Sequence, residues 1–127
     1  MQFSAAVVFV HDVPATLEFY ERAFGFPTKF YDEEYGFGEL DTGEATLAVA
    51  SHACADFVMR GAHEPSEAAS SVEIAFTTPD VDAAFARAVA AGAQIVTEPW
   101  SPPWGGTISY VRSVEGTLIG LVSPVEG

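Results

Sequence analysis

Two tryptophans are the side chains best suited to holding a flat ligand. Trp100 and Trp104 lie among Pro99, Pro102 and Pro103. Because these prolines exclude a regular central strand, we expect both rings on a loop, where they provide rigid aromatic plates for stacking. Packing onto the core as a lid is the alternative role. Four further aromatic side chains could add walls, although core packing is the commoner role for any one of them: Tyr35, Phe37, Phe57 and Tyr110.

Acidic residues are the second chemical feature of the sequence. The chain has 18 acidic and 5 basic residues and a pI near 4.2, which argues against nucleic acid and anionic membranes as partners. Between Lys29 and Arg60 the acids have no basic residue among them. Glu39 and Asp41 would share one strand face, because side chains alternate along a strand. These acids could line or flank a cleft and attract a cation, with solubility as the plainer explanation.

The thiol and the imidazoles give weaker signals. Cys54 is the only cysteine, so an internal disulfide is excluded, and we assign it no role. His11, His52 and His63 fall in expected turns or in a connector. We therefore interpret them as solvated or capping histidines rather than as metal ligands.

An internal duplication organises the elements that must position these residues. From Asp12 to Asp80, three pairs of apolar residues keep one constant offset: Val13 and Val81, Ala15 and Ala83, and Leu17 and Phe85. The first copy predicts a strand, a helix and three strands at residues 3–10, 12–24, 26–31, 37–41 and 45–51. The second repeats them at 72–77, 81–91, 94–97, 107–112 and 117–123. Residues 52–70 form a connector with room for one short helix around Phe57 and Met59.

Length and composition fit a single globular domain covering residues 1–127. The chain is 49% hydrophobic and 18% charged, which is typical of a folded protein rather than a disordered one. The apolar start of the chain carries no basic residue and is too short to span a bilayer, so we expect neither a signal peptide nor a membrane anchor. The cytoplasm is the expected location.

The sequence resembles the vicinal oxygen chelate superfamily, which includes glyoxalase I, extradiol dioxygenases and bleomycin resistance proteins. The resemblance covers nearly the whole chain and rests on Phe19-Tyr20, on Phe24-Gly25-Phe26, and on residues 72–81 and 112–122. Trp104-Gly105 also matches a pair found in bleomycin resistance proteins. The resemblance implies an α+β fold of two βαβββ modules, residues 1–51 and 71–127, each curling a mixed sheet around a cleft. It also implies a homodimer.

The same resemblance implies where a metal would bind. Metalloenzymes of the superfamily carry one ligand, typically His or Glu, on the first and last strand of each module. The corresponding positions here are Ala5 and Ala48 in the first module, and Glu73 and Gly120 in the second. Only Glu73 can donate to a metal ion. We therefore expect no metal site and no cofactor.

Small residues replace the lost ligands on the strand face that carried them. They are Ala5, Thr46, Ala48, Ala50, Ala75 and Gly120, whereas the opposite face carries Val8, Leu47, Val49, Ile74, Phe76, Ile119 and Leu121. The second face would pack against helices and the first would leave room for a ligand, unless the small residues only allow tight packing. Glu73 favours a cleft, because a carboxylate on an inward face must be hydrogen-bonded, paired or hydrated.

We therefore predict a metal-independent, dimeric protein that sequesters an aromatic, cationic small molecule, as a bleomycin resistance-like protein would. No catalytic residue is required. The expected ligand-binding residues are Glu73, Trp104, Trp100, Phe37, Glu39, Asp41, Phe57 and Tyr110. The alternative is an enzyme of the same superfamily, a lyase, isomerase or dioxygenase, with Glu73 as general base or with an atypical metal site. A regulatory or assembly module that uses the cleft for a partner is a third possibility.

Overall fold

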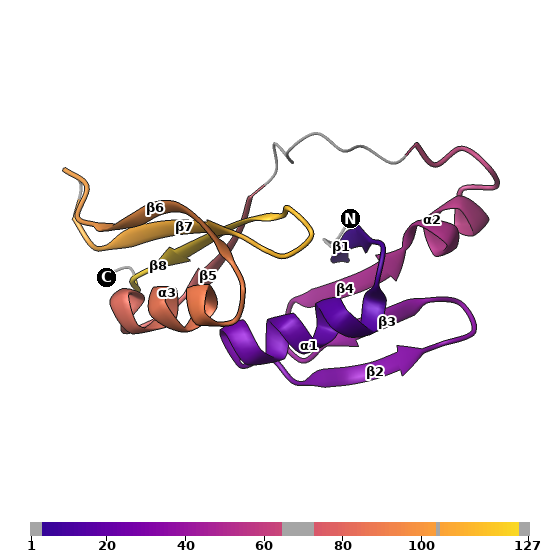
Figure 1. Cartoon of the computed structure of the whole chain (residues 1–127), viewed down its shortest axis with the longest axis horizontal. Helices are drawn as coiled ribbons and strands as arrows, with labels where there is room; N and C mark the ends of the chain where they lie inside the picture. The colour runs from indigo at the N-terminus through magenta and orange to yellow at the C-terminus, as the bar shows by residue number, and fades with distance from the viewer. Residues whose placement is uncertain (1–3, 65–72, 104, 125–127) are drawn as a thin grey trace. The chain divides into compact units, whose positions relative to one another are not determined.

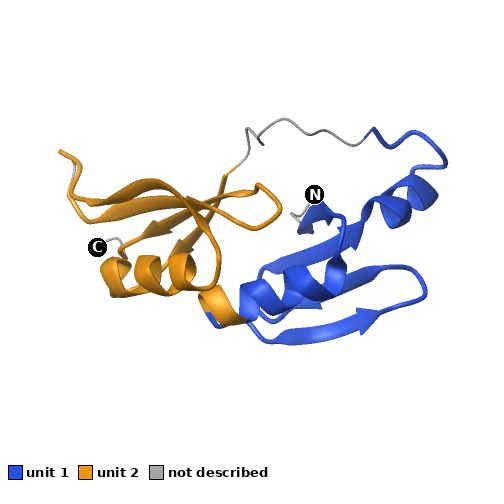
Figure 2. Cartoon of the chain, in the orientation of Figure 1, with its two compact units in different colours: residues 1–21, 25–67 blue, residues 22–24, 68–127 orange. Residues whose placement is uncertain are grey.

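The computed structural model describes residues 4–64, 73–103 and 105–124. These residues form an α+β protein of two four-stranded mixed sheets with three helices (Figure 1). The chain divides into two compact units (Figure 2). Unit one comprises residues 1–21 and 25–67, and unit two comprises residues 22–24 and 68–127. The predicted fold class is confirmed.

Unit one is a βαβββ module followed by a short helix. Its elements are β1 (Ala5–Val10), α1 (Val13–Phe24), β2 (Thr28–Asp32), β3 (Phe37–Leu40), β4 (Thr46–Ser51) and α2 (His52–Val58). The strand order is β1-β4-β3-β2. The first strand lies parallel to the last, with Ala5 opposite Thr46 and Val10 opposite Ser51, and the other pairs are antiparallel.

Unit two repeats this arrangement. It contains β5 (Glu73–Thr77), α3 (Val81–Ala90), β6 (Gln94–Trp100), β7 (Ile108–Arg112) and β8 (Leu118–Val122), in the strand order β5-β8-β7-β6. The first and last strands are again parallel, with Glu73 opposite Leu118. The two modules therefore share one topology, as the sequence duplication predicts.

Both long helices begin in the same way. Asp12 precedes α1 and Asp80 precedes α3, each in an extended conformation. The carboxylate Oδ1 of Asp12 accepts a hydrogen bond from the Ala15 amide at 3.0 Å, and Asp80 does the same for Ala83 at 3.0 Å. Each aspartate thus satisfies one of the amides that a helix start leaves unpaired. Gly25 ends α1 in the left-handed conformation, with φ of 78°.

Alternating burial fixes which face of each sheet meets its helix. In unit one, Gly38 and Leu40 of β3 are buried while their neighbours are only partly covered. A Cβ atom at Gly38 would lie 2.9 Å from Cδ1 of Leu17, so glycine allows α1 to approach the sheet closely. In unit two the buried residues Val111, Ile119 and Leu121 occupy β7 and β8. Among the described residues, no helix has the length and apolar character needed to cross a membrane.

The prediction of a loop at Trp100 is wrong. β6 continues through Pro99 to Trp100, which pairs with Ile108 of β7. β6 is an edge strand, and an edge tolerates a proline because one side of the strand needs no partner for its amide groups. The prolines correctly excluded a central strand, but Pro99 did not end β6. Trp104 lies outside the described residues.

Candidate functional site

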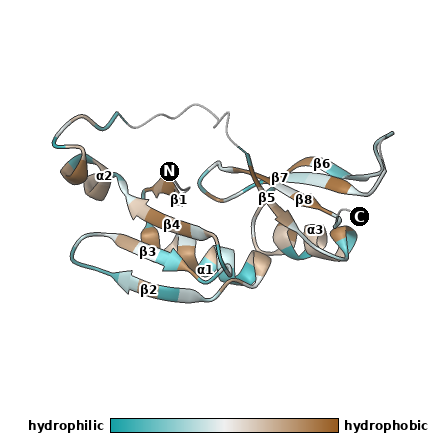
Figure 3. Cartoon of the chain, turned by 180° about the vertical axis from the view of Figure 1, so that it is seen from behind, coloured by the Kyte–Doolittle hydropathy of each residue, from teal (hydrophilic) through white to brown (hydrophobic). Residues whose placement is uncertain are grey.

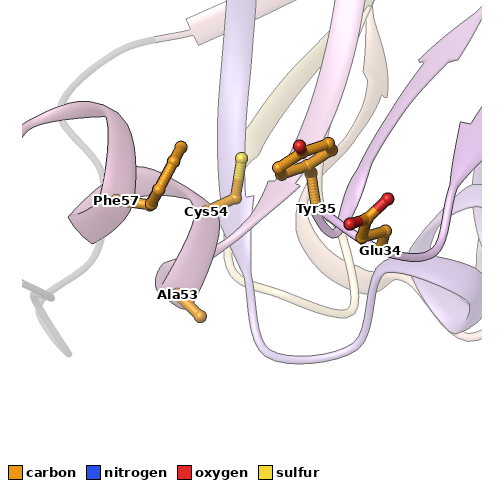
Figure 4. Close-up of a pocket in the computed structure, with 5 residues that line it drawn as sticks. All are labelled: Glu34, Tyr35, Ala53, Cys54 and Phe57. Carbon is orange, nitrogen blue, oxygen red and sulfur yellow. The ribbon is translucent and has the colours of Figure 1, made fainter.

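One concave feature of unit one lies between the β2–β3 turn and α2. We call it the turn–helix pocket. It has a volume of about 300 Å³, is open to solvent, and is lined by Glu34, Tyr35, Ala53, Cys54 and Phe57 (Figure 4). Tyr35 and Phe57 are 53% and 69% exposed. Their ring centroids lie 6.1 Å apart, with the ring planes inclined by 38°. Two aromatic side chains therefore face solvent at the same place.

The backbone around Gly36 holds the two sides of this pocket together. Asp32 stabilises the turn, because its Oδ1 accepts from the Tyr35 amide at 3.2 Å and its carbonyl accepts from the Gly36 amide at 2.9 Å. The Ser51 amide then donates to the Gly36 carbonyl at 2.8 Å. Ser51 also caps α2, since its Oγ accepts from the Cys54 amide at 2.9 Å. Ser51 thus connects the turn that carries Tyr35 to the helix that carries Phe57.

The lining of the turn–helix pocket combines aromatic, acidic and thiol groups. Glu34 comes from the acidic segment between Lys29 and Arg60, and its carboxylate is exposed. α2 is largely hydrophobic (Figure 3), and Cys54 lies on it, partly buried. None of the described residues that line the pocket is basic. The arrangement can therefore stack a flat ring and stabilise a positive charge beside it.

A second group of predicted site residues meets in unit two. The Oε1 atom of Glu73 lies 2.7 Å, and Cε1 of Tyr110 3.3 Å, from the position that a Cβ would take at Gly120. The absent side chain at Gly120 therefore makes room for a carboxylate and a phenol ring. Glu73 is exposed to solvent, so its charge is hydrated rather than buried. Trp100 lies on the far edge strand of the same sheet and is 46% exposed.

The strand positions that hold metal in related enzymes do not fit a metal ion here. Ala5, Ala48 and Gly120 have no donor atoms, which leaves Glu73 alone. In residues 4–64, 73–103 and 105–124, no group of three or more His, Cys, Asp or Glu side chains is arranged to hold a metal ion. A single carboxylate is too few ligands for a divalent cation. We therefore assign no metal chemistry to these strands.

The remaining predicted residues do not converge on one point. Phe37 and Glu39 lie two positions apart on β3, so their side chains share one face of the strand. The Phe37 ring lies 6.0 Å from that of Phe30. Oε2 of Glu39 lies 3.9 Å from the Lys29 ammonium, so its charge has a partner. Asp41 follows the end of β3 and accepts from the Gly43 amide at 3.4 Å, which means that its predicted place within the strand is wrong.

The small residues of β4 do not open a cavity. Ala48 and Ala50 are 0% and 2% exposed, so other side chains cover them. The alternative explanation, that small residues allow tight packing, accounts for both positions. The turn–helix pocket lies instead near the end of this strand, where Ser51 leads into α2.

Sequence reasoning missed part of the turn–helix pocket. Phe57 and Tyr35 were expected as aromatic walls, but Glu34 and Ala53 were not singled out and Cys54 was given no role. Nothing in the sequence indicated that the ring of His52 contacts the rings of His11 and His63. The available signal was a glycine at the turn together with a serine at the start of a short helix, but their contact joins segments that are distant in sequence.

Comparisons with known proteins agree with the fold. A family model described as the Glyoxalase/Bleomycin resistance protein/Dioxygenase superfamily matches residues 2–121. No curated protein matches the sequence. A glyoxalase-related enzyme from Fulvimarina pelagi has a similar structure, with a TM-score of 0.85 and 20% identity over 98% of this chain and 88% of that one. A glyoxalase/bleomycin resistance protein/dioxygenase family enzyme from Burkholderia phytofirmans PsJN has a TM-score of 0.83 and 23% identity over 96% of this chain and 98% of that one. TioX from Micromonospora sp. ML1 has a TM-score of 0.72 and 23% identity over 98% of this chain and 100% of that one.

Proposed function

Because the chain belongs to the Glyoxalase/Bleomycin resistance protein/Dioxygenase superfamily, we propose that it is a metal-independent protein that sequesters a flat, cationic aromatic compound. Sequestration of this kind is how a binding protein confers antibiotic resistance without chemistry. The observation that supports the proposal is the turn–helix pocket, where Tyr35, Phe57 and Glu34 surround one open depression.

Charge and stacking have separate roles in this proposal. The formal net charge of −13 attracts cations over distance, and this attraction raises the association rate at low salt. Glu34 then lies beside a cation that has entered the pocket. Aromatic contact contributes about 0.5–1.5 kcal/mol for each ring beyond the area that it buries. Dissociation should therefore depend mainly on Tyr35 and Phe57.

We expect the protein to bind 9-aminoacridine, a flat cation, more tightly than acridine, which is neutral at pH 8, and to bind acridine-9-carboxylate least. Fluorescence titration with EDTA present measures all three affinities. Glu34→Gln should weaken 9-aminoacridine binding roughly two- to fivefold, in line with a partly hydrated ion pair, and leave acridine binding unchanged. Glu33→Gln is the matched control, because Glu33 is an exposed neighbour outside the pocket lining.

Equal affinity for the three acridines would contradict the proposal, and so would a requirement for added metal. The second candidate function is an enzyme with Glu73 as general base, favoured by the exposed carboxylate beside Tyr110. Glu73→Gln separates the two. If it abolishes probe binding while Glu34→Gln has no effect, the site lies on the sheet of unit two and the enzyme becomes the better candidate.

We also propose that two copies of the chain form a twofold dimer. Each sheet has two open edges, β1 and β2 in unit one and β5 and β6 in unit two. β6 also exposes Ile95, Val96 and Trp100 to solvent. Unpaired edges that carry apolar side chains favour association with a second copy. Light scattering at micromolar concentration should give twice the 13.5 kDa chain mass, and a monomer would contradict the proposal.

A further inference from the structure

All three histidines of the chain lie together in unit one. His52 is the first residue of α2, His63 follows that helix, and His11 lies between β1 and α1. Nδ1 of His52 and Nε2 of His63 are 2.9 Å apart and form a hydrogen bond. The ring of His11 lies beside that of His52, with centroids 4.6 Å apart. Imidazole is the side chain that changes charge near neutral pH, so the response of this protein to mild acid is concentrated here.

The hydrogen bond between His52 and His63 depends on how many protons the pair holds. One nitrogen must donate an N–H group and the other must offer a lone pair. The bond therefore forms when both rings are neutral, and it is stronger when one ring is an imidazolium, because a charged donor bonds more strongly. A second proton occupies the remaining lone pair. Two N–H groups and two positive charges then face each other, and the rings separate.

This hydrogen bond holds the segment of chain that follows α2. The Gly61 amide donates to the Asp56 carbonyl at 2.8 Å, and Arg60 adopts a φ of 56°, so the chain reverses after the helix. The reversal leads to His63, whose ring centroid lies 5.2 Å from that of His52 and 5.2 Å from that of Phe9 on β1. Ring contacts with His52 and Phe9 therefore fasten residues 59–64 to unit one.

α2 depends on contacts outside itself. It has seven residues, of which Ala55 alone is fully buried. A helix of this length is marginal without tertiary contacts, and segments with few buried contacts open most easily. His52 also occupies the helix start, where the helix dipole disfavours a positive charge. Protonation of both rings should therefore loosen α2 as well as the segment after it.

The other charges around the pair stay constant in mild acid. β1 and β4, the strands that α2 contacts, carry no ionisable side chain. The described side chains that carry or can take a charge on α2, beside it and in the pocket lining are Asp12, Glu34, Cys54, Asp56, Arg60 and Glu64. Carboxylates and guanidinium groups keep their charge from about pH 7.5 to 5.5, and thiols stay largely neutral. Among the described neighbours, His11 changes charge with the pair, and its protonation adds to the repulsion at His52.

We propose that His52 and His63 form a pH-sensitive switch, closed while the two rings share a hydrogen bond and open when both are protonated. Opening takes up protons from solvent, releases residues 59–64 from Phe9 and loosens α2. The consequence for binding rests on the proposed function. Mild acid should release the ligand, because α2 carries Phe57 and two other residues of the turn–helix pocket.

Backbone NMR relaxation of the full-length chain at pH 7.5 and 5.5 tests the switch. The order parameters of residues 59–64 should fall from about 0.85, typical of rigid backbone, to below about 0.6. The amide of Ala84, which donates to the Asp80 carbonyl at 3.1 Å in unit two, is the internal control, because unit two has no histidine. Its order parameter should not change. Circular dichroism at each pH checks that the chain stays folded.

Two amide variants remove the titration and keep a hydrogen-bonding group at the same place. Glutamine at position 63 mimics Nε2 and asparagine at position 52 mimics Nδ1, and a primary amide both donates and accepts. The pH response should disappear in His63→Gln and in His52→Asn. His11→Gln is the matched control, since it keeps the hydrogen-bonded pair, and it should retain the response. The switch is overturned if residues 59–64 of the wild type are equally ordered at both pH values, if either amide variant responds as the wild type does, or if His11→Gln removes the response.

Titration with 9-aminoacridine at the two pH values separates this inference from the proposed function. The affinity of the wild type should fall at least fivefold at pH 5.5, and that of His63→Gln should be the same at both. An ordered-to-mobile change without probe binding at either pH contradicts the proposed function and supports the switch. Probe binding without any change in order contradicts the switch alone. Equal binding at both pH values while the segment opens disproves control of the pocket.

Discussion

Gly36→Ala is expected to lower the free energy of unfolding by about 2–3 kcal/mol and to abolish 9-aminoacridine binding. Gly36 has a φ of 69°, a conformation that costs an alanine about 1–2 kcal/mol. An added Cβ would also clash with Oγ of Ser51. Moving that oxygen removes the cap of α2, which is worth about 1 kcal/mol. Urea denaturation gives the stability change and fluorescence titration gives the binding.

Gly43→Ala is the matched control for this experiment. Gly43 also has a positive φ, 98°, but no atom lies within 4 Å of the position of its Cβ. The control therefore carries the backbone strain without the clash at Ser51. We expect it to be destabilised less than Gly36→Ala and to bind the probe normally. Equal stability losses and retained binding in both variants would show that Gly36 does not hold the pocket together.

Phe57→Ala is expected to weaken 9-aminoacridine binding roughly tenfold, or about 1.4 kcal/mol, with little change in stability. Phe57 is 69% exposed, so the unit loses few packing contacts when the ring is removed. The bound probe, in contrast, loses one of two aromatic walls. Stopped-flow fluorescence should show most of the change in the dissociation rate, because stacking acts after encounter.

Val58→Ala provides the comparison for Phe57→Ala. Val58 is the next residue of α2, is 65% exposed, and does not line the turn–helix pocket. This variant should bind the probe as wild type does. If the two variants weaken binding equally, the effect comes from a general loss of apolar surface on α2. If neither changes binding, the probe does not use this pocket.

The fold was predictable because its signals are local and occur twice. Asp12 and Asp80 identify the starts of two helices from the local sequence alone. Gly25 identifies the end of the first helix in the same way. The duplication then predicted a second module with the same succession of strands and helix. The error at Trp100 arose because Pro99 identifies an edge strand only when the sheet order is known.

The candidate site was less predictable, because it depends on contacts between distant segments. Tyr35 and Phe57 were candidates for aromatic walls, with core packing as the commoner role, but the contact between Gly36 and Ser51 that connects their segments is a property of the folded unit. The contact between the rings of His11 and His52 has the same origin. It follows from the parallel pairing of β1 with β4, which places His11 near His52 although no local pattern connects them.

The parallel pairing of first and last strands has a consequence for how each unit folds during synthesis. Within the first module, β1 is synthesised before the other strands, yet its partner β4 is synthesised after them. The antiparallel strands between them can pair early, because their contacts close short loops. β1 can join the sheet only after β4, its pairing partner, has been synthesised. The second module repeats the same delay with β5 and β8, so the nascent chain should acquire protease resistance in two steps.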